Sequence, residues 1–109
     1  MTDATKVKEI IHKIADKIIE EYKPKKVILF GSYAYGEPTK ESDVDFLIIK
    51  ETDKRPIDRW IEVKRLLRNL HLTIPVSPLV YTEKEILDRI AIKDFFIREI
   101  LDRGKVLYG

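Results

Sequence analysis

Two short stretches of the sequence decide the fold: LFGSYAYG at residues 29–36 and DVDFL at residues 43–47. Each joins an apolar run to a polar connection. The first closes the apolar run 26–30, and the second opens the run 43–50, which is apolar on both faces after its aspartates. Such a run is typical of a strand buried at the centre of a sheet. The sequence therefore predicts two core strands joined by a polar connection over residues 31–42.

Two aspartates, Asp43 and Asp45, stand at the start of the second predicted strand. Because alternate residues of a strand face the same side, both carboxylates should project together, with Cβ atoms roughly 7 Å apart. Unpaired charge beside an apolar strand is costly, and a bound cation removes that cost. Oxygen donors of this kind suit a hard cation such as Mg²⁺. The pair is therefore a candidate metal site.

Gly31 and Ser32 end the first predicted strand and form the other half of the candidate site. A glycine there lets backbone N–H groups approach an anion closely, and the serine adds a hydroxyl donor. Phosphate groups on one side and a cation on the other indicate a nucleoside triphosphate bound with Mg²⁺. Each half alone is a weak signal, because Gly-Ser is common in turns and Asp-x-Asp in solvated loops. The ten residues between Ser32 and Asp43, with an apolar run on each side, make the combination specific.

The remaining segments alternate between helical and extended patterns. Helical spacing of apolar residues, or a capping residue before such a stretch, predicts four helices. They are residues 7–22, residues 56–70, a helix opened by the capping box at Thr82, and a helix from Asp94 to Gly104. Residues 73–81 form an extended segment whose two prolines favour a sheet edge, and residues 106–108 form a short apolar tail. This order predicts an α/β sandwich, with a small mixed sheet covered by helices.

The composition fits one globular domain over residues 1–109 and narrows the classes of function. Hydrophobic residues make up 44% of the chain, too many for a disordered protein. The net charge of +2 argues against a protein that coats nucleic acid or an anionic membrane.

The absence of cysteine excludes thiolate metal sites and cysteine nucleophiles. No apolar run reaches 18 residues, so we expect a cytoplasmic protein. Charged residues at 37%, with no glutamine, favour a thermophilic origin.

The pattern of Gly-Ser, ten residues and Asp-x-Asp resembles the signature of the minimal nucleotidyltransferases of the polymerase-β superfamily, and the likeness covers almost the whole chain. The resemblance implies the nucleotidyltransferase fold and the transfer of a nucleoside monophosphate, above all AMP, from ATP or another NTP to a hydroxyl. It further implies that Gly31 and Ser32 hold the triphosphate. Asp43 and Asp45 would be the catalytic residues that bind Mg²⁺.

Many small members of this family are similar to the antitoxin half of HEPN/MNT toxin–antitoxin pairs. The resemblance therefore implies a HEPN-type toxin as protein partner and acceptor. The nearly balanced charge and the lack of a long apolar run argue against nucleic acid or a membrane as partner. The resemblance leaves open whether copies of the chain associate with one another. Two other functions also stay open. One is a catalytically weakened antitoxin that acts by contact alone, and the other is a transferase for a small molecule such as an antibiotic.

The sequence departs from the family pattern at two positions. The family has Ala-Arg-Gly in the turn after Gly-Ser, and this chain has Tyr35 in place of the arginine. We expect Tyr35 to pack over the loop. Aligning residues 75–76 and 81–82 with the family pattern puts Ser77 where a third carboxylate normally stands. Because a serine hydroxyl is a poor metal ligand, we expect the chain to bind Mg·NTP but to transfer slowly.

Overall fold

The computed structural model describes residues 4–109, which form a four-stranded mixed sheet in the order β3-β2-β1-β4. The strands are β1 (Lys26–Phe30), β2 (Val44–Ile49), β3 (Val76–Tyr81) and β4 (Lys105–Tyr108). β1 pairs antiparallel with both β2 and β4, whereas β2 and β3 are parallel. The prediction of a small mixed sheet is confirmed.

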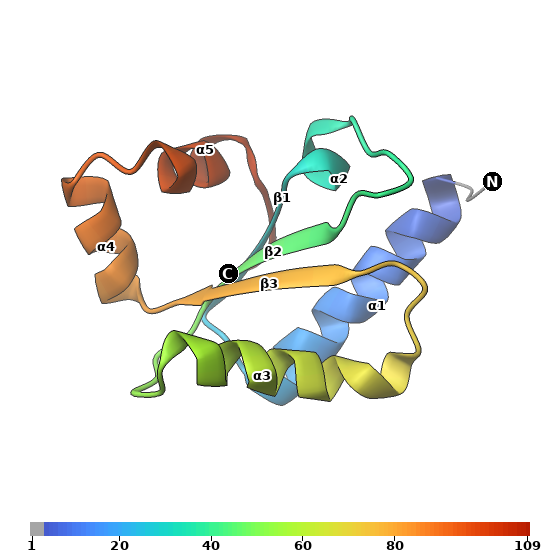
Figure 1. Ribbon diagram of the computed structural model, residues 1–109, viewed down its shortest axis with the longest axis horizontal. Helices are drawn as coiled ribbons and strands as arrows, with labels where there is room; N and C mark the ends of the chain where they lie inside the picture. Colours follow the sequence, from blue (N-terminus) through green and yellow to red (C-terminus); the bar gives the residue numbers. More distant parts are fainter. Residues whose placement is uncertain (1–3) are drawn as a thin grey trace.

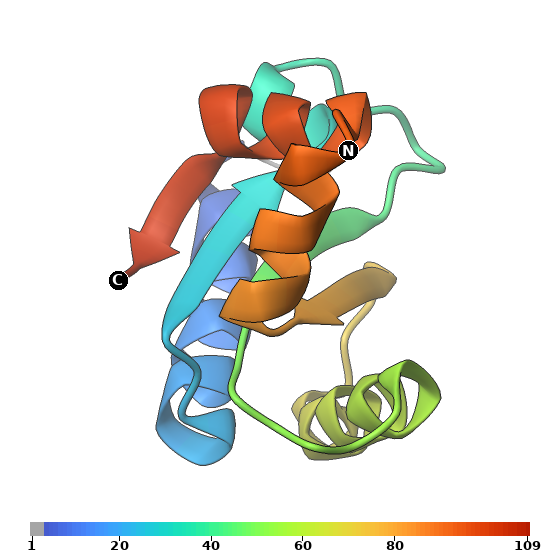
Figure 2. The same cartoon turned by 90° about the vertical axis from the view of Figure 1, so that its left-hand side faces the viewer.

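Helices cover both faces of this sheet (Figures 1 and 2). They are α1 (Ala4–Tyr22), α2 (Ser32–Tyr35), α3 (Pro56–Leu67, extended by a 3₁₀ turn over Arg68–Leu70), α4 (Glu83–Ala91) and α5 (Phe95–Arg103). α1 and α3 pack on one face, and α4 and α5 pack on the other. Within the described residues, no helix is long and apolar enough to cross a bilayer.

The core consists of two apolar clusters, one on each face of the sheet. Side chains of β1 alternate between them: Val27 and Leu29 join the α1–α3 cluster, and Ile28 and Phe30 join the α4–α5 cluster. This alternation explains why the two central strands are apolar at nearly every position.

The structure corrects the sequence prediction in two places. Residues 32–35, predicted as part of a polar connection, form the single helical turn α2, which is too short to show a helical period. The predicted apolar tail is strand β4, whose Lys105 and Val106 pair with Leu29 and Ile28 of β1. Three of the four β4 residues are exposed, so the strand lacks the alternation by which an edge strand is recognised.

Candidate functional site

Gly31 and Asp45 meet where β1 ends and β2 begins. Phe30 is the register partner of Asp45, so the chain that leaves β1 passes directly beside the Asp45 side chain. A Cβ atom on Gly31 would overlap the carboxylate oxygen Oδ2 and lie 3.1 Å from Cγ of Asp45. Gly31 has φ 75° and ψ −161°, a backbone conformation that only glycine adopts readily. Glycine therefore allows the Asp45 carboxylate to lie against the turn.

The two aspartates form a pair of nearby carboxylates, with Asp43 exposed and Asp45 half-buried. Burial raises the pKa of the Asp45 carboxyl above its ordinary value of 3.8, and the negative charge of Asp43 raises it further. Both effects disfavour the ionised carboxylate, and a bound cation relieves both. The oxygen donors and their mutual repulsion fit one Mg²⁺.

Ser77 lies beside both aspartates. In the parallel register of β2 and β3 it is the partner of Asp45, and its hydroxyl donates a hydrogen bond to Oδ2 of Asp43 at 3.4 Å. Position 77, where the family pattern has a third carboxylate, thus lies at the site, and in this chain it carries a neutral serine. Across residues 4–109, no group of three or more His, Asp or Glu side chains is placed to hold a metal ion.

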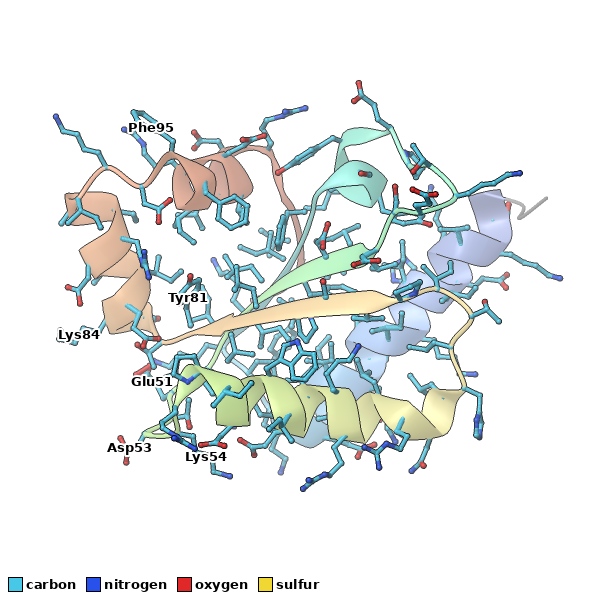
Figure 3. The ribbon with its side chains drawn as sticks, in the orientation of Figure 1. Glu51, Asp53, Lys54, Tyr81, Lys84 and Phe95 are labelled. Carbon is cyan, nitrogen blue, oxygen red and sulfur yellow. The ribbon has the colours of Figure 1, made fainter. Side chains whose placement is uncertain are left out.

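Two further acidic residues, Asp53 and Glu62, do not replace the missing carboxylate. Asp53 follows β2 and lies at the opposite end of that strand from α2 (Figure 3). Glu62 belongs to α3, where its carboxylate pairs with Lys54 at 3.1 Å. The site therefore has two carboxylates.

The turn after β1 is ordered by its own backbone. The N–H groups of Ala34 and Tyr35 both donate to the carbonyl oxygen of Gly31 at 2.9 Å. These hydrogen bonds form the single turn of α2, which begins at Ser32. Tyr35 packs against the α4–α5 cluster, and the guanidinium of Arg103 lies 4.1 Å from its ring centroid. Sequence reasoning missed Arg103, because no motif links it to the distant turn.

A groove of about 710 Å³ lies on the α1 side of the loop that leads into β2, and neither Asp43 nor Asp45 lines it. Its lining includes Tyr33, Lys40, Ser42 and Pro75. Ser42 directly precedes Asp43, and hydrogen bonds between Thr39 and Ser42 order this part of the loop.

Comparison with known proteins decides the family of the chain. The profile of a family described as "Nucleotidyltransferase domain" matches residues 11–107, which include the turn, both aspartates and Ser77. The chain belongs to this family of nucleotidyltransferases. The resemblance to nucleotidyltransferases recognised in the sequence is therefore confirmed, and the enzyme class with it.

Individual relatives of this nucleotidyltransferase agree. It is 36% identical to a Methanocaldococcus jannaschii protein named "Putative protein adenylyltransferase", over 99% of its own length and 100% of the relative's. A second protein of that name and organism is 34% identical, over 79% of this chain and 84% of the relative. Among solved structures, it resembles a "putative nucleotidyltransferase" from Sulfolobus solfataricus with a TM-score of 0.58 and 27% identity. That match covers 82% of this chain and 81% of the other.

Proposed function

We propose that this nucleotidyltransferase is a protein adenylyltransferase, which transfers AMP from Mg·ATP to a hydroxyl group of a protein partner. The observation that carries the proposal is the meeting of Asp43 and Asp45 with the Gly31-Ser32 turn. The names of the two Methanocaldococcus jannaschii relatives support AMP as the transferred group and a protein as its acceptor.

Each half of the site has its own task in this reaction. Asp43 and Asp45 hold the Mg²⁺, while the backbone at Gly31 and the hydroxyl of Ser32 hold the triphosphate. When bound, the cation neutralises phosphate charge and orients the triphosphate. The acceptor oxygen forms a bond to the α-phosphorus as the bond from that phosphorus to pyrophosphate breaks, and the hydroxyl proton leaves to water. The protein contributes mainly position and electrostatic stabilisation.

The acceptor in this proposal is a tyrosine hydroxyl of a HEPN-type toxin, and the chain acts as its antitoxin. The family resemblance supports this choice of partner. The groove on the α1 side of the loop that leads to Asp43 gives a protein partner a surface to contact. Lys40 and Ser42 give the groove polar contacts for a peptide segment.

A second candidate is an antitoxin that neutralises its partner by contact alone. The observation in its favour is Ser77, which stands beside Asp43 and Asp45 where a third carboxylate would complete the site. With two carboxylates, the activation of the attacking hydroxyl is weakened more than the binding of Mg·ATP. The two candidates differ in whether neutralisation depends on Asp43 and Asp45.

The deciding experiment incubates the chain with a purified HEPN-type protein from the same organism and ATP labelled at either the α- or the γ-phosphate. Adenylyl transfer puts only the α-label on the partner, and the Asp43→Asn/Asp45→Asn double variant abolishes it. Label from the γ-phosphate would mean phosphoryl transfer and would overturn the proposal. If the double variant still neutralises the toxin and no label appears, the contact-only function is correct.

A further inference from the structure

A cation from a distant element lies on the helical turn that follows the glycine. Arg103, the last residue of α5, places its guanidinium 4.1 Å from the ring centroid of Tyr35, the last residue of α2. α2 and α5 lie side by side at the same end of the sheet (Figures 1 and 2). The distance is typical of a cation–π interaction, which holds an arginine without neutralising its charge.

The backbone beside Arg103 is fixed by close packing against β1. A Cβ atom on Gly104 would overlap the carbonyl oxygen of Ile100 and lie 2.5 Å from Cγ2 of Ile28, so only glycine lets α5 end this near β1. The Gly104 N–H donates to the carbonyl of Ile100 at 2.8 Å, and Lys105 then pairs with Leu29. Arg103 therefore stands near the point where β1 leads into Gly31.

The guanidinium retains donors for a ligand. Its Nη1 contacts Oε1 of Glu99 at 3.3 Å, one helical turn earlier, and the Arg103 side chain is 57% exposed. A guanidinium has five N–H donors in a planar fork, so a single exposed partner leaves most of them available. Exposed i,i+4 pairs of this kind are weak, and a stronger anion competes for the arginine easily.

The position of Tyr35 relates this cation to the proposed triphosphate site. Ser32 and Tyr35 are three residues apart on α2, and side chains at this spacing are neighbours on a helix surface. Arg103, seated on Tyr35, is thus about one helical turn from Ser32. The turn itself has no basic residue between Gly31 and Gly36, and Arg103 of α5 places a guanidinium on its last residue.

We propose that Arg103 binds the β- and γ-phosphates of the nucleoside triphosphate, and that Tyr35 is the platform that positions it. The inference rests on the proposed function, since it needs a triphosphate at Gly31 and Ser32. Arginine suits this role because its planar fork donates two parallel hydrogen bonds to phosphate oxygens. Tyr35 thereby positions an arginine from α5 beside a turn that has no arginine itself.

The experiment is a calorimetric titration of Mg·ATP and, separately, AMP into the wild type, Arg103→Gln and Arg103→Lys. A charge-assisted contact contributes about 1.5–3 kcal/mol, so Arg103→Gln should weaken ATP binding by about 10- to 100-fold and leave AMP binding unchanged. Arg103→Lys, which keeps the charge but not the fork, should show a smaller loss. The matched control is Arg98→Gln, an exposed arginine on the same helix, which should bind both nucleotides as the wild type does.

Two further variants test the platform. Tyr35→Phe keeps the ring and should bind ATP normally, whereas the double variant Tyr35→Arg/Arg103→Gln should regain ATP affinity because the turn then supplies its own guanidinium. Equal ATP affinities for Arg103→Gln and the wild type would overturn this inference and leave the proposed function standing. Equal losses for ATP and AMP would also overturn it, because the contact would not be to the β- or γ-phosphate. Absence of ATP binding by the wild type would overturn both proposals.

Discussion

Gly31 has two properties that a side chain at this position would disrupt: a positive φ and direct contact with the Asp45 carboxylate. Gly36, at the other end of α2, shares the positive φ but has no atom within 4 Å of its virtual Cβ. Both Gly31→Ala and Gly36→Ala should lose about 1–3 kcal/mol of stability through backbone strain. Only Gly31→Ala should also lose Mg·ATP affinity, by at least about tenfold, because it displaces Asp45. Calorimetry on both variants checks this, and equal ATP affinities would contradict the contact.

Asp45 destabilises the folded protein at neutral pH, since burial and then the Asp43 charge raise the pKa of its carboxyl above 3.8. Below pH 3.8 the group is protonated in both the folded and the unfolded state and has no effect. As the pH rises through the raised folded-state pKa, ionisation lowers the free energy of unfolding. Asp45→Asn should therefore increase Tm by a few degrees at pH 7 and leave it unchanged at pH 3.

Thermal unfolding followed by circular dichroism across this pH range measures the effect of Asp45→Asn. Asp43→Asn is the matched control. It removes only the smaller of the two causes, so its increase in Tm at pH 7 should be smaller. A decrease in Tm for Asp45→Asn at pH 7 would mean that Asp45 stabilises the metal-free fold, and it would contradict the prediction.

Ser77 allows a test of how many carboxylates the reaction needs. Ser77→Asp places a third carboxylate opposite Asp45 and next to Asp43, so the number of Mn²⁺ ions bound per chain with ATP should increase from one to two. The transfer rate should rise by about 10²-fold, the lower end of the range over which such charge stabilisation acts. Titration followed by electron paramagnetic resonance gives the stoichiometry. Ser77→Asn, neutral and of similar size, should leave it at one, and an unchanged count in Ser77→Asp would show that position 77 is not a ligand position.

At the scale of elements, a buried arginine joins α3, β3 and α4. Arg59 is 5% exposed, and its guanidinium donates to Oε1 of Glu85 at 2.7 Å and to the carbonyls of Lys54 and Val80. The same Glu85 oxygen accepts from the backbone N–H of Thr82, completing the capping box of α4. The ion pair between Arg59 and Glu85 thus fixes where α4 begins relative to α3.

Arg59→Met should destabilise the protein by about 2–4 kcal/mol, because two carbonyls lose their guanidinium donor and the Glu85 carboxylate loses its ion-pair partner. Glu85→Gln keeps a capping acceptor and leaves a side chain that is one-third exposed, so it should cost less. Urea unfolding at pH 7 measures both. Lys84→Gln, which breaks an exposed pair with Asp88, is the control and should cost under about 0.5 kcal/mol.

The pH dependence of Glu85 has the opposite sign to that of Asp45. Burial opposes ionisation of the Glu85 carboxyl, but hydrogen bonds from Arg59 and Thr82 and the Arg59 charge outweigh it, so its pKa lies below 4.5. Its contribution to stability is present above pH 4.5 and is lost as the pH falls through the lowered folded-state pKa. The difference between Glu85→Gln and wild type should therefore vanish near pH 2, and a difference that persists there would contradict the assignment.

Most elements were predictable because their signals are local. The α1 stripe, the N-caps Thr82 and Asp94, and the apolar runs of β1 and β2 are all found in the structure. α2 and β4 were not predicted, since one is a single turn and the other is defined by pairing with distant β1. The same limit applies to the site. The Gly-Ser and Asp-x-Asp spacing is local, whereas the approach of Arg103 to Tyr35 depends on the packing of α5.

At the scale of the whole molecule, the candidate site depends on both apolar clusters. The contact between Gly31 and Asp45 depends on the pairing of β1 with β2, and both strands carry side chains in both clusters. The position of Ser77 depends on α3, which connects β2 to β3 on one face of the sheet. The position of Arg103 depends on the packing of α5 on the other face. If the two faces unfolded separately, the site would lose one set of residues while keeping the other.

We expect the described fold to unfold in a single cooperative transition, because β1 and β2 cannot stay ordered when either cluster is exposed to water. Trp60, the single tryptophan, is 44% exposed on α3 with Nζ of Lys64 5.6 Å from its ring centroid, so its fluorescence reports the unfolding of α3. The double variant Trp60→Phe/Phe96→Trp moves that probe to α5, where Phe96 stacks edge-on against Phe30 at 5.7 Å. For each protein, the urea midpoint from fluorescence should coincide with its midpoint from circular dichroism. An earlier transition for the probe on α5 would mean that α4 and α5 form a separate unit, and ATP binding should then fall at urea concentrations where Trp60 still reports a folded α3 face.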